Sequence, residues 1–279
     1  MVEELREDYS VSVICKALGI ARSTYYDSHL PKPGDKKLIK AIDKIIMKWP
    51  TYGYRRITHQ LKREGHEVGE TRVRRLLRQL EHSCSVGKAP YPTTNSQHEH
   101  PRYPNLIKYL EISHLNQVWV ADITYIRYER SFIYLAIILD AFSRGVRGWK
   151  LGRNIDKHLT ISALEKALEA YPAPVYHHSD QGVQYATPAY TSLLSGTTQI
   201  SMSKAGCPTE NGIAERFIRT FKEEHIDYTE YSSFTDAVEQ VTYWMEVNYM
   251  TERIHSSLNY LTPLEFEVLQ NALPEPRNP

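Results

Sequence analysis

The pattern of apolar and polar positions predicts a β-sheet in the second half of the chain. In the stretch 118–128, odd and even positions are both mostly apolar, and Asp122 stands among them. A strand with two apolar faces is usually central in a sheet. Two further apolar stretches, at 132–140 and 144–151, follow after short turns. The three strands are therefore expected to form an antiparallel meander.

Beyond the meander, the apolar spacing alternates between helical and strand periods. The expected elements are, in order, a helix at 159–171, a strand ending at His177 or His178, a helix at 188–194, a strand at 199–202 and a helix from 211 to about 226. Three antiparallel strands followed by helix, strand, helix, strand and helix is the order of the ribonuclease-H-like fold. The sequence thus predicts an α/β catalytic domain of this class over 106–279, with a C-terminal helical extension.

The first half of the chain has a helical pattern instead. Amphipathic stripes at 35–48, 54–64 and 70–80 predict a small, basic, all-helical module over 31–80. At the start of its second helix, the segment TYGYRRI places Arg55 and Arg56 beside tyrosines, a mixture suited to phosphate contact and base stacking. A glycine-containing connection with packed tyrosines explains the same segment without DNA.

Two further segments flank this module. Residues 1–30 contain two short helical stretches around Gly19, which is the spacing of a helix-turn-helix whose second helix could offer Arg22 to DNA. A simple helical pair with a small apolar core explains this segment too. Residues 81–105 are rich in Pro, Ser, Thr, Asn and His, which is typical of a linker, and exposed linker histidines explain His98 and His100 better than a metal site does.

Composition excludes several classes of protein. Of the 279 residues, 41% are hydrophobic and 24% are charged, as in ordinary globular proteins. The N-terminus is acidic and polar, and the longest apolar run, 132–139, is too short to span a bilayer, so we expect a cytoplasmic protein with no membrane partner. The three cysteines are widely spaced, which signals neither a disulfide framework nor a structural zinc site.

Charge is distributed unevenly along the chain. Residues 1–110 carry 20 Lys and Arg against 12 Asp and Glu, a net charge of +8, whereas residues 111–279 carry 14 against 21, a net charge of −7. A basic half suits the phosphates of DNA, and an acidic half with clustered carboxylates suits divalent cations. For any single Lys or Arg, a solvated helix surface is an equally good explanation.

Three acids from separate stretches are the main candidates for chemistry: Asp122, Asp180 and Glu215. An unpaired carboxylate on a central strand costs several kcal/mol unless a partner or a cation neutralises it. In the predicted topology the three acids meet at one end of the sheet, with Arg219 and Lys222 further along the helix that carries Glu215. Such a trio fits phosphoryl chemistry with two Mg²⁺ ions about 4 Å apart, and Mn²⁺ could replace Mg²⁺.

Two other acids compete for these roles. Glu210 lies near the start of the same helix, where an acid is often favoured by the helix dipole alone. Asp140 follows the second strand and is more simply a turn or capping residue. His177 and His178 precede Asp180 and could orient it or a water molecule, although packed histidines are an equal explanation.

Five strings in order, WVADITYI, FIYLAIILDAFSR, HHSDQGVQY, SMSKAGCPTENGIAERF and RIHSSLNYLTPLEF, resemble the catalytic domain of DDE transposases related to retroviral integrases. The pattern is similar to that of the second-frame protein of the bacterial "IS-three" insertion sequences, and the N-terminal half shares the resemblance. Two departures stand out. Between Asp180 and Glu215 lie 34 residues, one fewer than is usual in that family, and Thr209, Glu210 and Asn211 replace the common WDN.

The resemblance implies the site residues and the activity. It identifies Asp122, Asp180 and Glu215 as the DDE triad and places Lys222 on DNA near the cleaved end. With it, the residues expected to contact DNA are Lys222, Arg219, Lys204, Arg55, Arg56, Tyr54 and Arg22. The implied activity is that of a DNA transposase, with metal-dependent cleavage at the 3′ ends of an insertion sequence and strand transfer to target DNA.

The implied partners are element ends, target DNA and further copies of the chain in a synaptic homo-oligomer, with an upstream-frame protein as another candidate. The expected location is the bacterial cytoplasm, in association with the nucleoid. Two alternatives stay open: a ribonuclease-H-like nuclease acting on hybrids or junctions, and a catalytically dead, domesticated DNA-binding protein.

Overall fold

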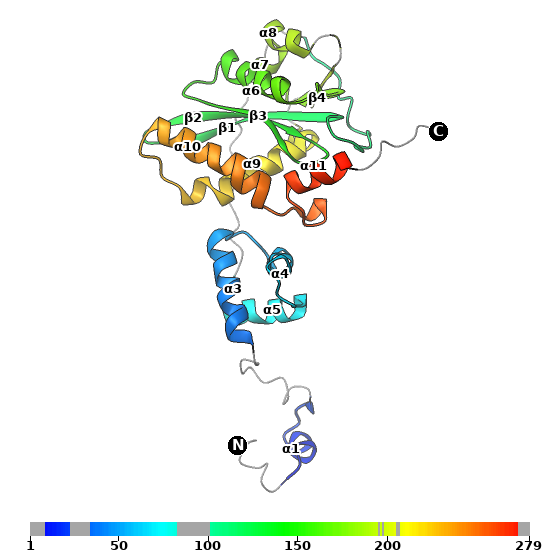
Figure 1. Ribbon diagram of the computed structural model, residues 1–279, viewed down its shortest axis with the longest axis vertical. Coiled ribbons are helices and arrows are strands. Elements are labelled where there is room, and N and C mark those ends of the chain that lie inside the picture. Colours follow the sequence, from blue (N-terminus) through cyan, green and yellow to red (C-terminus); the bar gives the residue numbers. More distant parts are fainter. Residues whose placement is uncertain are drawn as a thin grey trace, which may run out of the picture.

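A five-stranded mixed sheet forms the centre of the larger part of the molecule (Figure 1). The computed structural model describes residues 9–22, 34–82, 101–194, 196, 198–204 and 207–272. The strands are β1 (Val118–Tyr128), β2 (Ser131–Asp140), β3 (Val146–Gly152), β4 (Tyr176–Ser179) and β5 (Gln199–Met202), in the order β3-β2-β1-β4-β5. β1, β2 and β3 pair antiparallel, as predicted, whereas β4 runs parallel to both β1 and β5. The ribonuclease-H-like order is confirmed.

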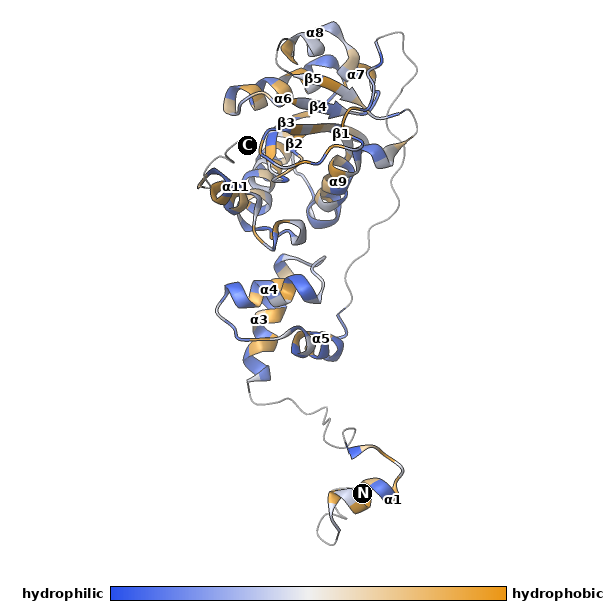
Figure 2. Ribbon diagram, turned by 90° about the vertical axis from the view of Figure 1, so that its right-hand side faces the viewer, coloured by the Kyte–Doolittle hydropathy of each residue, from blue (hydrophilic) through white to orange (hydrophobic). Residues whose placement is uncertain are grey.

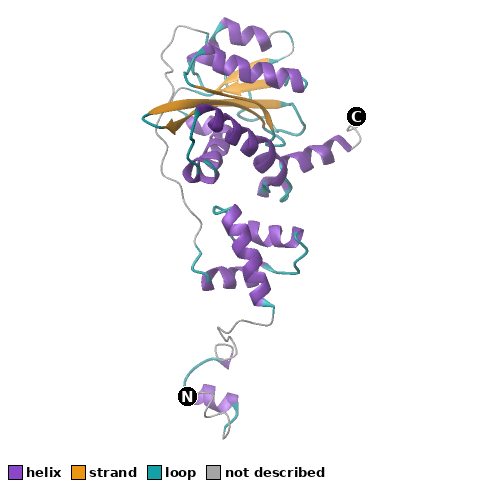
Figure 3. Cartoon of the chain, turned by 60° about the vertical axis from the view of Figure 1, so that its left-hand side comes forward, coloured by secondary structure: helices purple, strands orange, loops and turns teal. Residues whose placement is uncertain are grey.

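Helices cover both faces of the sheet (Figure 3). One face packs on α6 (Lys157–Ala170), and alternate β1 residues such as Trp119 join this core. The other face packs on α9 (Gly212–Glu224), α10 (Phe234–Tyr243) and the π-helical stretch η5 (Trp244–Glu252), with Val120 from β1 in that core. The strand that carries Asp122 is therefore central and apolar on both faces, as its sequence predicts.

Several boundaries differ from the predicted ones. The helix expected at 188–194 is divided into α8 (Pro188–Thr191) and the 3₁₀ turn η2 (Ser192–Leu194), and a further short helix, α7 (Val183–Ala186), precedes it. Proline disfavours the helical conformation in the residue before it, and Thr187 is extended, with a ψ of 143°. The third strand begins at Val146, two residues later than predicted, because Arg144 lies in the left-handed region with a φ of 64°.

The segment after α9 contains structure for which no boundaries were predicted. α9 ends at Glu224 and is followed by the 3₁₀ turn η4 (Ile226–Tyr228), then by α10 and η5. Another 3₁₀ turn, η3 (Pro208–Asn211), precedes α9. The chain closes with η6 (Ser256–Leu258) and α11 (Pro263–Ala272), which provide the turn and helix expected at the C-terminus.

The helical module consists of α3 (Asp35–Lys48), α4 (Tyr54–Arg63) and α5 (Glu70–Gln79), each within one residue of its prediction. Orange hydrophobic and blue hydrophilic segments share these helices in Figure 2, as expected for amphipathic helices around a small core. Tyr52 is fully buried and stacks on Trp49 with 5.3 Å between ring centroids. The packed-tyrosine explanation of the TYGYRRI segment therefore holds for Tyr52.

The module lies against the C-terminal segment of the catalytic domain. The Ile254 amide donates a hydrogen bond to the Tyr52 hydroxyl over 3.1 Å, and the Ile254 side chain belongs to the module core. His59 stacks on Tyr260 with 3.5 Å between ring centroids, and Lys48 pairs with Glu252 at 2.8 Å. These contacts connect α3 and α4 to the end of η5 and to the segment that follows it.

Part of the N-terminal prediction lies outside the described residues. α1 (Val11–Ala17) forms the first of the two short helices, and Arg22 is exposed beyond it. The second helix of the expected helix-turn-helix, and the linker histidines His98 and His100, fall outside the description. Among the described helices, none combines the length and the apolar character that crossing a membrane requires.

Candidate active site

The sheet topology brings the three candidate acids to one place from three elements. Asp122 lies in the middle of β1, Asp180 directly follows β4, and Glu215 lies in the first turn of α9. β4 runs parallel to β1 with His178 opposite Val120, so Asp180 continues to the level of Asp122. Asp180 and Glu215 are both close enough to act on the charge of Asp122.

Local hydrogen bonds hold two of the carboxylates. The Ile123 amide donates to Asp122 Oδ1 over 2.8 Å, and the Gly182 amide donates to Asp180 Oδ1 over 2.9 Å. A Cβ on Gly182 would stand 2.9 Å from the same Asp180 oxygen, so glycine allows the close turn. The sequence SDQGVQ thus shapes a tight loop that fixes Asp180 beyond the strand.

Electrostatics distinguish Asp122 from an ordinary buried acid. Burial raises its pKa to about 8, and the charges of Asp180 and Glu215 raise it as well. The hydrogen bond from Ile123 and the charge of Lys222 act in the opposite direction without compensating. Without a cation the site retains a proton near neutral pH, so its groups suit a bound positive ion.

Lys222 stands at the edge of this group. Its ammonium lies 4.4 Å from the centroid of the Tyr125 ring, a cation–π contact. Burial lowers the pKa of Lys222, whereas the charge of Asp122 raises it. The helix that carries Glu215 thus also places a cation beside the acids, as its spacing predicts.

The three acids do not yet form a finished ligand shell. Among the described residues, no three carboxylate, histidine or cysteine side chains form a ready group for a metal ion. The charges of Asp180 and Glu215 can raise the pKa of Asp122 over distances longer than those at which side chains share a metal ion. The donors are nevertheless all carboxylate oxygens, the ligand type that Mg²⁺ and Mn²⁺ prefer.

The rival acid Glu210 is occupied elsewhere. Its carboxylate accepts hydrogen bonds from the Lys204 amide at 2.9 Å and from the Asn105 side chain at 3.0 Å, and Lys108 lies 3.7 Å away. The bonds from Lys204 and Asn105 lower its pKa. Glu210 therefore joins the segment before β1 to the segment after β5, which favours Glu215 as the third acid.

The rival Asp140 forms the turn that the sequence suggests. Both of its oxygens accept backbone amides, from Asn116 at 2.7 Å, Phe142 at 2.9 Å and Ser143 at 2.8 Å, and Arg147 lies 3.4 Å away. Asp140 is fully buried. With its acceptors used by the protein, Asp140 acts as a structural group.

The two histidines before Asp180 are packed inside the sheet. His177 Nε2 lies 3.0 Å from the Tyr190 hydroxyl, and His178 Nδ1 lies 2.8 Å from Ser201 Oγ. Burial lowers the pKa of His177 to about 3 and that of His178 to about 4. Both imidazoles are neutral at physiological pH, in line with the packing explanation.

Tyr185 is a neighbour of the site for which the sequence offers only a weak signal, its position five residues after Asp180. It is buried, and its hydroxyl has no hydrogen-bond partner among the described residues. Burial raises its pKa, and Asp122 and Asp180 contribute to the rise. Its hydroxyl is thus an unused donor near the acids.

The predicted DNA-contact residues divide into two groups. Lys204, Arg219, Arg55 and Arg22 are exposed. The Arg55 guanidinium lies 5.2 Å from the centroid of the half-buried Tyr54 ring, so both remain available at the module surface. Arg56 differs: its side chain is 19% exposed and faces Glu224 of α9 at 4.0 Å. The structure separates the two adjacent arginines, one on the surface and one at the junction of the two parts.

Comparison with known proteins defines the class. The family described as "Integrase core domain" matches residues 113–208, and a second family of the same description matches 197–263. A family described as "HTH-like domain" matches 33–88, which is the helical module.

Two relatives and one solved structure extend these matches. A 31 kDa protein of insertion element IS600 from Shigella sonnei is 32% identical over 91% of this chain and 97% of its own length. Transposase InsF for insertion sequence IS3A from Escherichia coli is 28% identical over 95% of this chain and 96% of its own length. A solved HTLV-2 integrase catalytic core in complex with magnesium is 18% identical, covering 55% of this chain and 95% of its own, with a TM-score of 0.38.

The chain belongs to the family of insertion-sequence transposases that carry an integrase core domain. It is a DNA-binding DDE transposase, a polynucleotidyl transferase. These relationships favour neither the hybrid or junction nuclease nor the domesticated binding protein.

Proposed function

We propose that Asp122, Asp180 and Glu215 are the catalytic triad of this transposase and hold two Mg²⁺ ions, which Mn²⁺ can replace. The observation that carries the proposal is the state of Asp122, a carboxylate on a central strand whose pKa is raised to about 8 by burial and by Asp180 and Glu215. When bound, the two ions supply Lewis-acid stabilisation of the attacking and leaving oxygens. Closing the ligand shell requires side-chain rotation, which the half-buried Glu215 in the first turn of α9 permits.

The proposed reaction has two phosphoryl-transfer steps. In the first, a water oxygen bonds to phosphorus at the 3′ end of the element, the bond from phosphorus to the 3′ oxygen breaks, and a 3′-hydroxyl is released. In the second, this hydroxyl oxygen attacks a target phosphodiester, whose own 3′ oxygen leaves as a hydroxyl. Each step forms one P–O bond and breaks one, so no covalent enzyme intermediate is needed.

The protein supplies the arrangement of groups. The Ile123 and Gly182 amides hold Asp122 and Asp180 in place, and Lys222 provides a cation for the DNA next to the cleaved bond. Exposed cations on the module, Arg55 among them, contribute affinity for DNA phosphates. Joining two element ends implies a homo-oligomer acting in the bacterial cytoplasm at the nucleoid, with an upstream-frame protein as a further partner.

The test uses the full chain and a duplex taken from the inverted repeats that flank its gene. We expect Asp122→Asn, Asp180→Asn and Glu215→Gln each to lower cleavage and joining in Mg²⁺ at least 100-fold, because neutral amides are poor ligands for hard cations. DNA binding should change less than threefold, since cations elsewhere supply it. Glu210→Gln is the matched control, with activity expected within threefold of wild type. Near-normal joining by one of the three variants would remove that residue from the triad.

A further inference from the structure

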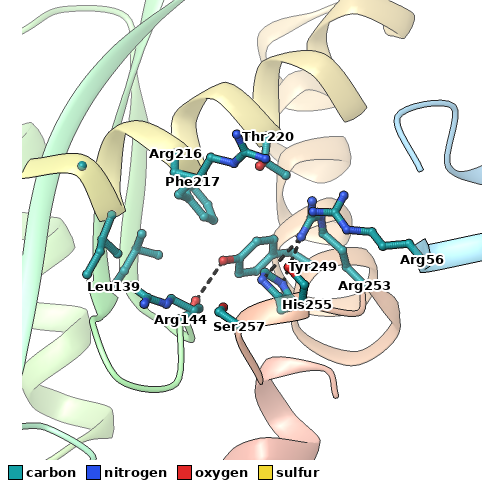
Figure 4. A pocket seen from close by; sticks show the side chains of 13 residues that line it. Arg56, Leu139, Arg144, Arg216, Phe217, Thr220, Tyr249, Arg253, His255 and Ser257 are labelled. Carbon is teal, nitrogen blue, oxygen red and sulfur yellow. Dashed lines mark hydrogen bonds between the residues drawn. The ribbon is translucent and has the colours of Figure 1, made fainter. Parts of the chain in front are cut away.

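A basic pocket of about 350 Å³ lies between α9, the C-terminal segment and the helical module (Figure 4). Of the described residues that line it, four are arginines and none is acidic: Arg56 from α4, Arg144 from the turn before β3, Arg216 from α9 and Arg253 after η5. Leu139, Phe217 and Tyr249 add an apolar part to the wall. Four cations converge here from distant stretches of the chain.

Glu224 is a carboxylate in contact with these arginines, and its oxygens already accept hydrogen bonds from the protein. Glu224 accepts two hydrogen bonds from Arg253, at 2.6 and 2.8 Å, and a third from the Thr51 hydroxyl at 2.6 Å. Its distance to Arg56 is 4.0 Å. One carboxylate therefore balances one guanidinium well and a second one weakly, which leaves an excess of positive charge around the pocket.

Two of these arginines disfavour the charge of Arg56. Burial lowers the pKa of Arg56, and the charges of Arg253 and Arg216 lower it further. Burial lowers the pKa of Arg144 as well, and the charge of Asp140 opposes this shift only in part. His255, in the same wall, has its pKa lowered by burial and by three of these arginines, so it stays neutral. Grouping like charges in a partly apolar cavity is unfavourable unless an anion occupies it.

Backbone geometry points the same way. Arg144 has a φ of 64°, a left-handed conformation that is uncommon for a residue with a side chain, and its carbonyl is held by the Tyr249 hydroxyl at 3.0 Å. Strained residues gather where function requires a particular placement. Here the turn and the bond from Tyr249 fix the residue whose side chain lines the pocket beside α9.

We infer that this pocket binds a backbone phosphate of the DNA on which the transposase acts. Guanidinium groups form paired hydrogen bonds to phosphate oxygens, and the hydroxyls of Thr220, Ser256 and Ser257 add donors in the same wall. Glu215 and Arg216 are consecutive on α9, so their side chains leave the helix about 100° apart. The phosphate in the pocket is thus distinct from the one at the acids, and Arg56 lets it contact the helical module too.

The inference rests on the proposed action on DNA, and its test separates the two. Binding of a labelled element-end duplex to the full chain is measured by fluorescence anisotropy in EDTA over a series of salt concentrations. We expect Arg216→Gln and Arg144→Gln each to weaken binding about fivefold to twentyfold and to lower the slope of log K against log salt by about 1, the effect of one lost phosphate contact. Arg216 is exposed, so its variant should fold normally.

Arg130→Gln is the matched control, because Arg130 is an exposed arginine in the turn between β1 and β2, at the end of β2 away from Leu139. It should retain wild-type affinity and slope. Unchanged affinity and slope in both pocket variants would overturn the inference. A second outcome would also overturn the inference. Inorganic phosphate would raise the melting temperature of the wild type but not that of Arg144→Gln, while the DNA affinity of the variant stayed unchanged. The pocket would then bind free phosphate and not DNA.

Strand joining by the wild type in Mg²⁺ is measured alongside. If the wild type joins strands and the pocket variants bind DNA as the wild type does, the phosphate pocket is rejected and the proposed function stands. If the wild type does not join strands but the pocket variants show reduced salt slopes, the proposed chemistry is rejected and the phosphate pocket stands.

Discussion

Asp35 in the helical module is fully buried and Asp122 in the sheet is half-buried, and the surroundings of the two carboxylates differ. Asp35 is fully buried at the start of α3, where its oxygens accept hydrogen bonds from Arg72 at 3.0 and 2.7 Å and from Arg75 at 2.7 Å. Asp122 has one backbone donor, two acidic neighbours and a lysine whose charge compensates only in part. The module satisfies its acid with its own side chains, whereas the sheet does not.

This difference separates structural from functional burial of charge. A buried acid with two arginines connects α3 to α5 and leaves no role for a ligand. A buried acid among other acids is unfavourable in the isolated protein and becomes favourable when a cation arrives. Removing the charge should therefore have opposite effects on stability at the two positions.

The largest expected effect is at Asp35. Asp35→Asn leaves Arg72 and Arg75 side by side without their counter-ion, and we expect the module to lose about 2–3 kcal/mol of stability, since both arginines are partly exposed. Hydrogen exchange of the α3 and α5 amides in the full chain measures this loss. Asp43→Asn, at an exposed position of the same helix, is the control and should change exchange little. Equal protection in the two variants would contradict a structural role for Asp35.

A smaller effect of opposite sign is expected at Asp122. Its pKa is about 8 in the folded protein against 3.8 as the ordinary value, so the metal-free folded state holds a proton that the unfolded chain releases. Stability should therefore fall as the pH rises from about 4 to about 8. Asp122→Asn should remove this pH dependence and stabilise the metal-free protein at pH 8 by about 1–2 kcal/mol. This value is smaller than the full pKa shift implies, because water screens the charge of a half-buried carboxylate.

Thermal melts in EDTA across this pH range test the prediction at Asp122. Added Mg²⁺ should raise the midpoint of the wild type and of Asp43→Asn but not that of Asp122→Asn. A destabilised Asp122→Asn protein with no pH dependence in the wild type would place Asp122 with Asp35 among the structural acids.

The smallest effect on stability is expected at Lys222. Lys222→Ala removes the contact with the Tyr125 ring, worth about 0.5–1 kcal/mol, and a cation that lowers the pKa of Asp122. We expect joining of specific ends to fall about tenfold, while metal-dependent nicking of unrelated DNA falls less, because under the proposed function the lysine binds DNA beside the cleaved bond. Gel assays with both substrates measure the ratio.

Lys166 offers a matched comparison, since its ammonium lies 5.2 Å from the Trp149 ring and it belongs to α6, which packs on the face of the sheet opposite α9. Lys166→Ala should leave both reactions unchanged. Equal losses on the two substrates in Lys222→Ala would assign Lys222 to general electrostatics and not to end recognition.

The sequence was sufficient for the features that depend on local periodicity. The apolar faces around Asp122 predict a central strand, and the stripes of α3, α4 and α5 predict the module to within a residue. Backbone conformation at single residues interrupts the patterns that periodicity extends: the extended Thr187 separates α7 from α8, and β3 starts after the left-handed Arg144.

Only the tertiary structure decides which charged groups become partners, because ion pairs form between residues far apart in sequence. Arg55 and Arg56 are adjacent and equivalent in the sequence, yet one lies on the surface and the other faces Glu224 across the junction. Glu210 competes with Glu215 for one role in the sequence, and the hydrogen bonds that Glu210 accepts from Lys204 and Asn105 add a structural reason to favour Glu215. Sequence periodicity determines which face of an element is buried, whereas the packing of separate elements determines what each buried charge meets there.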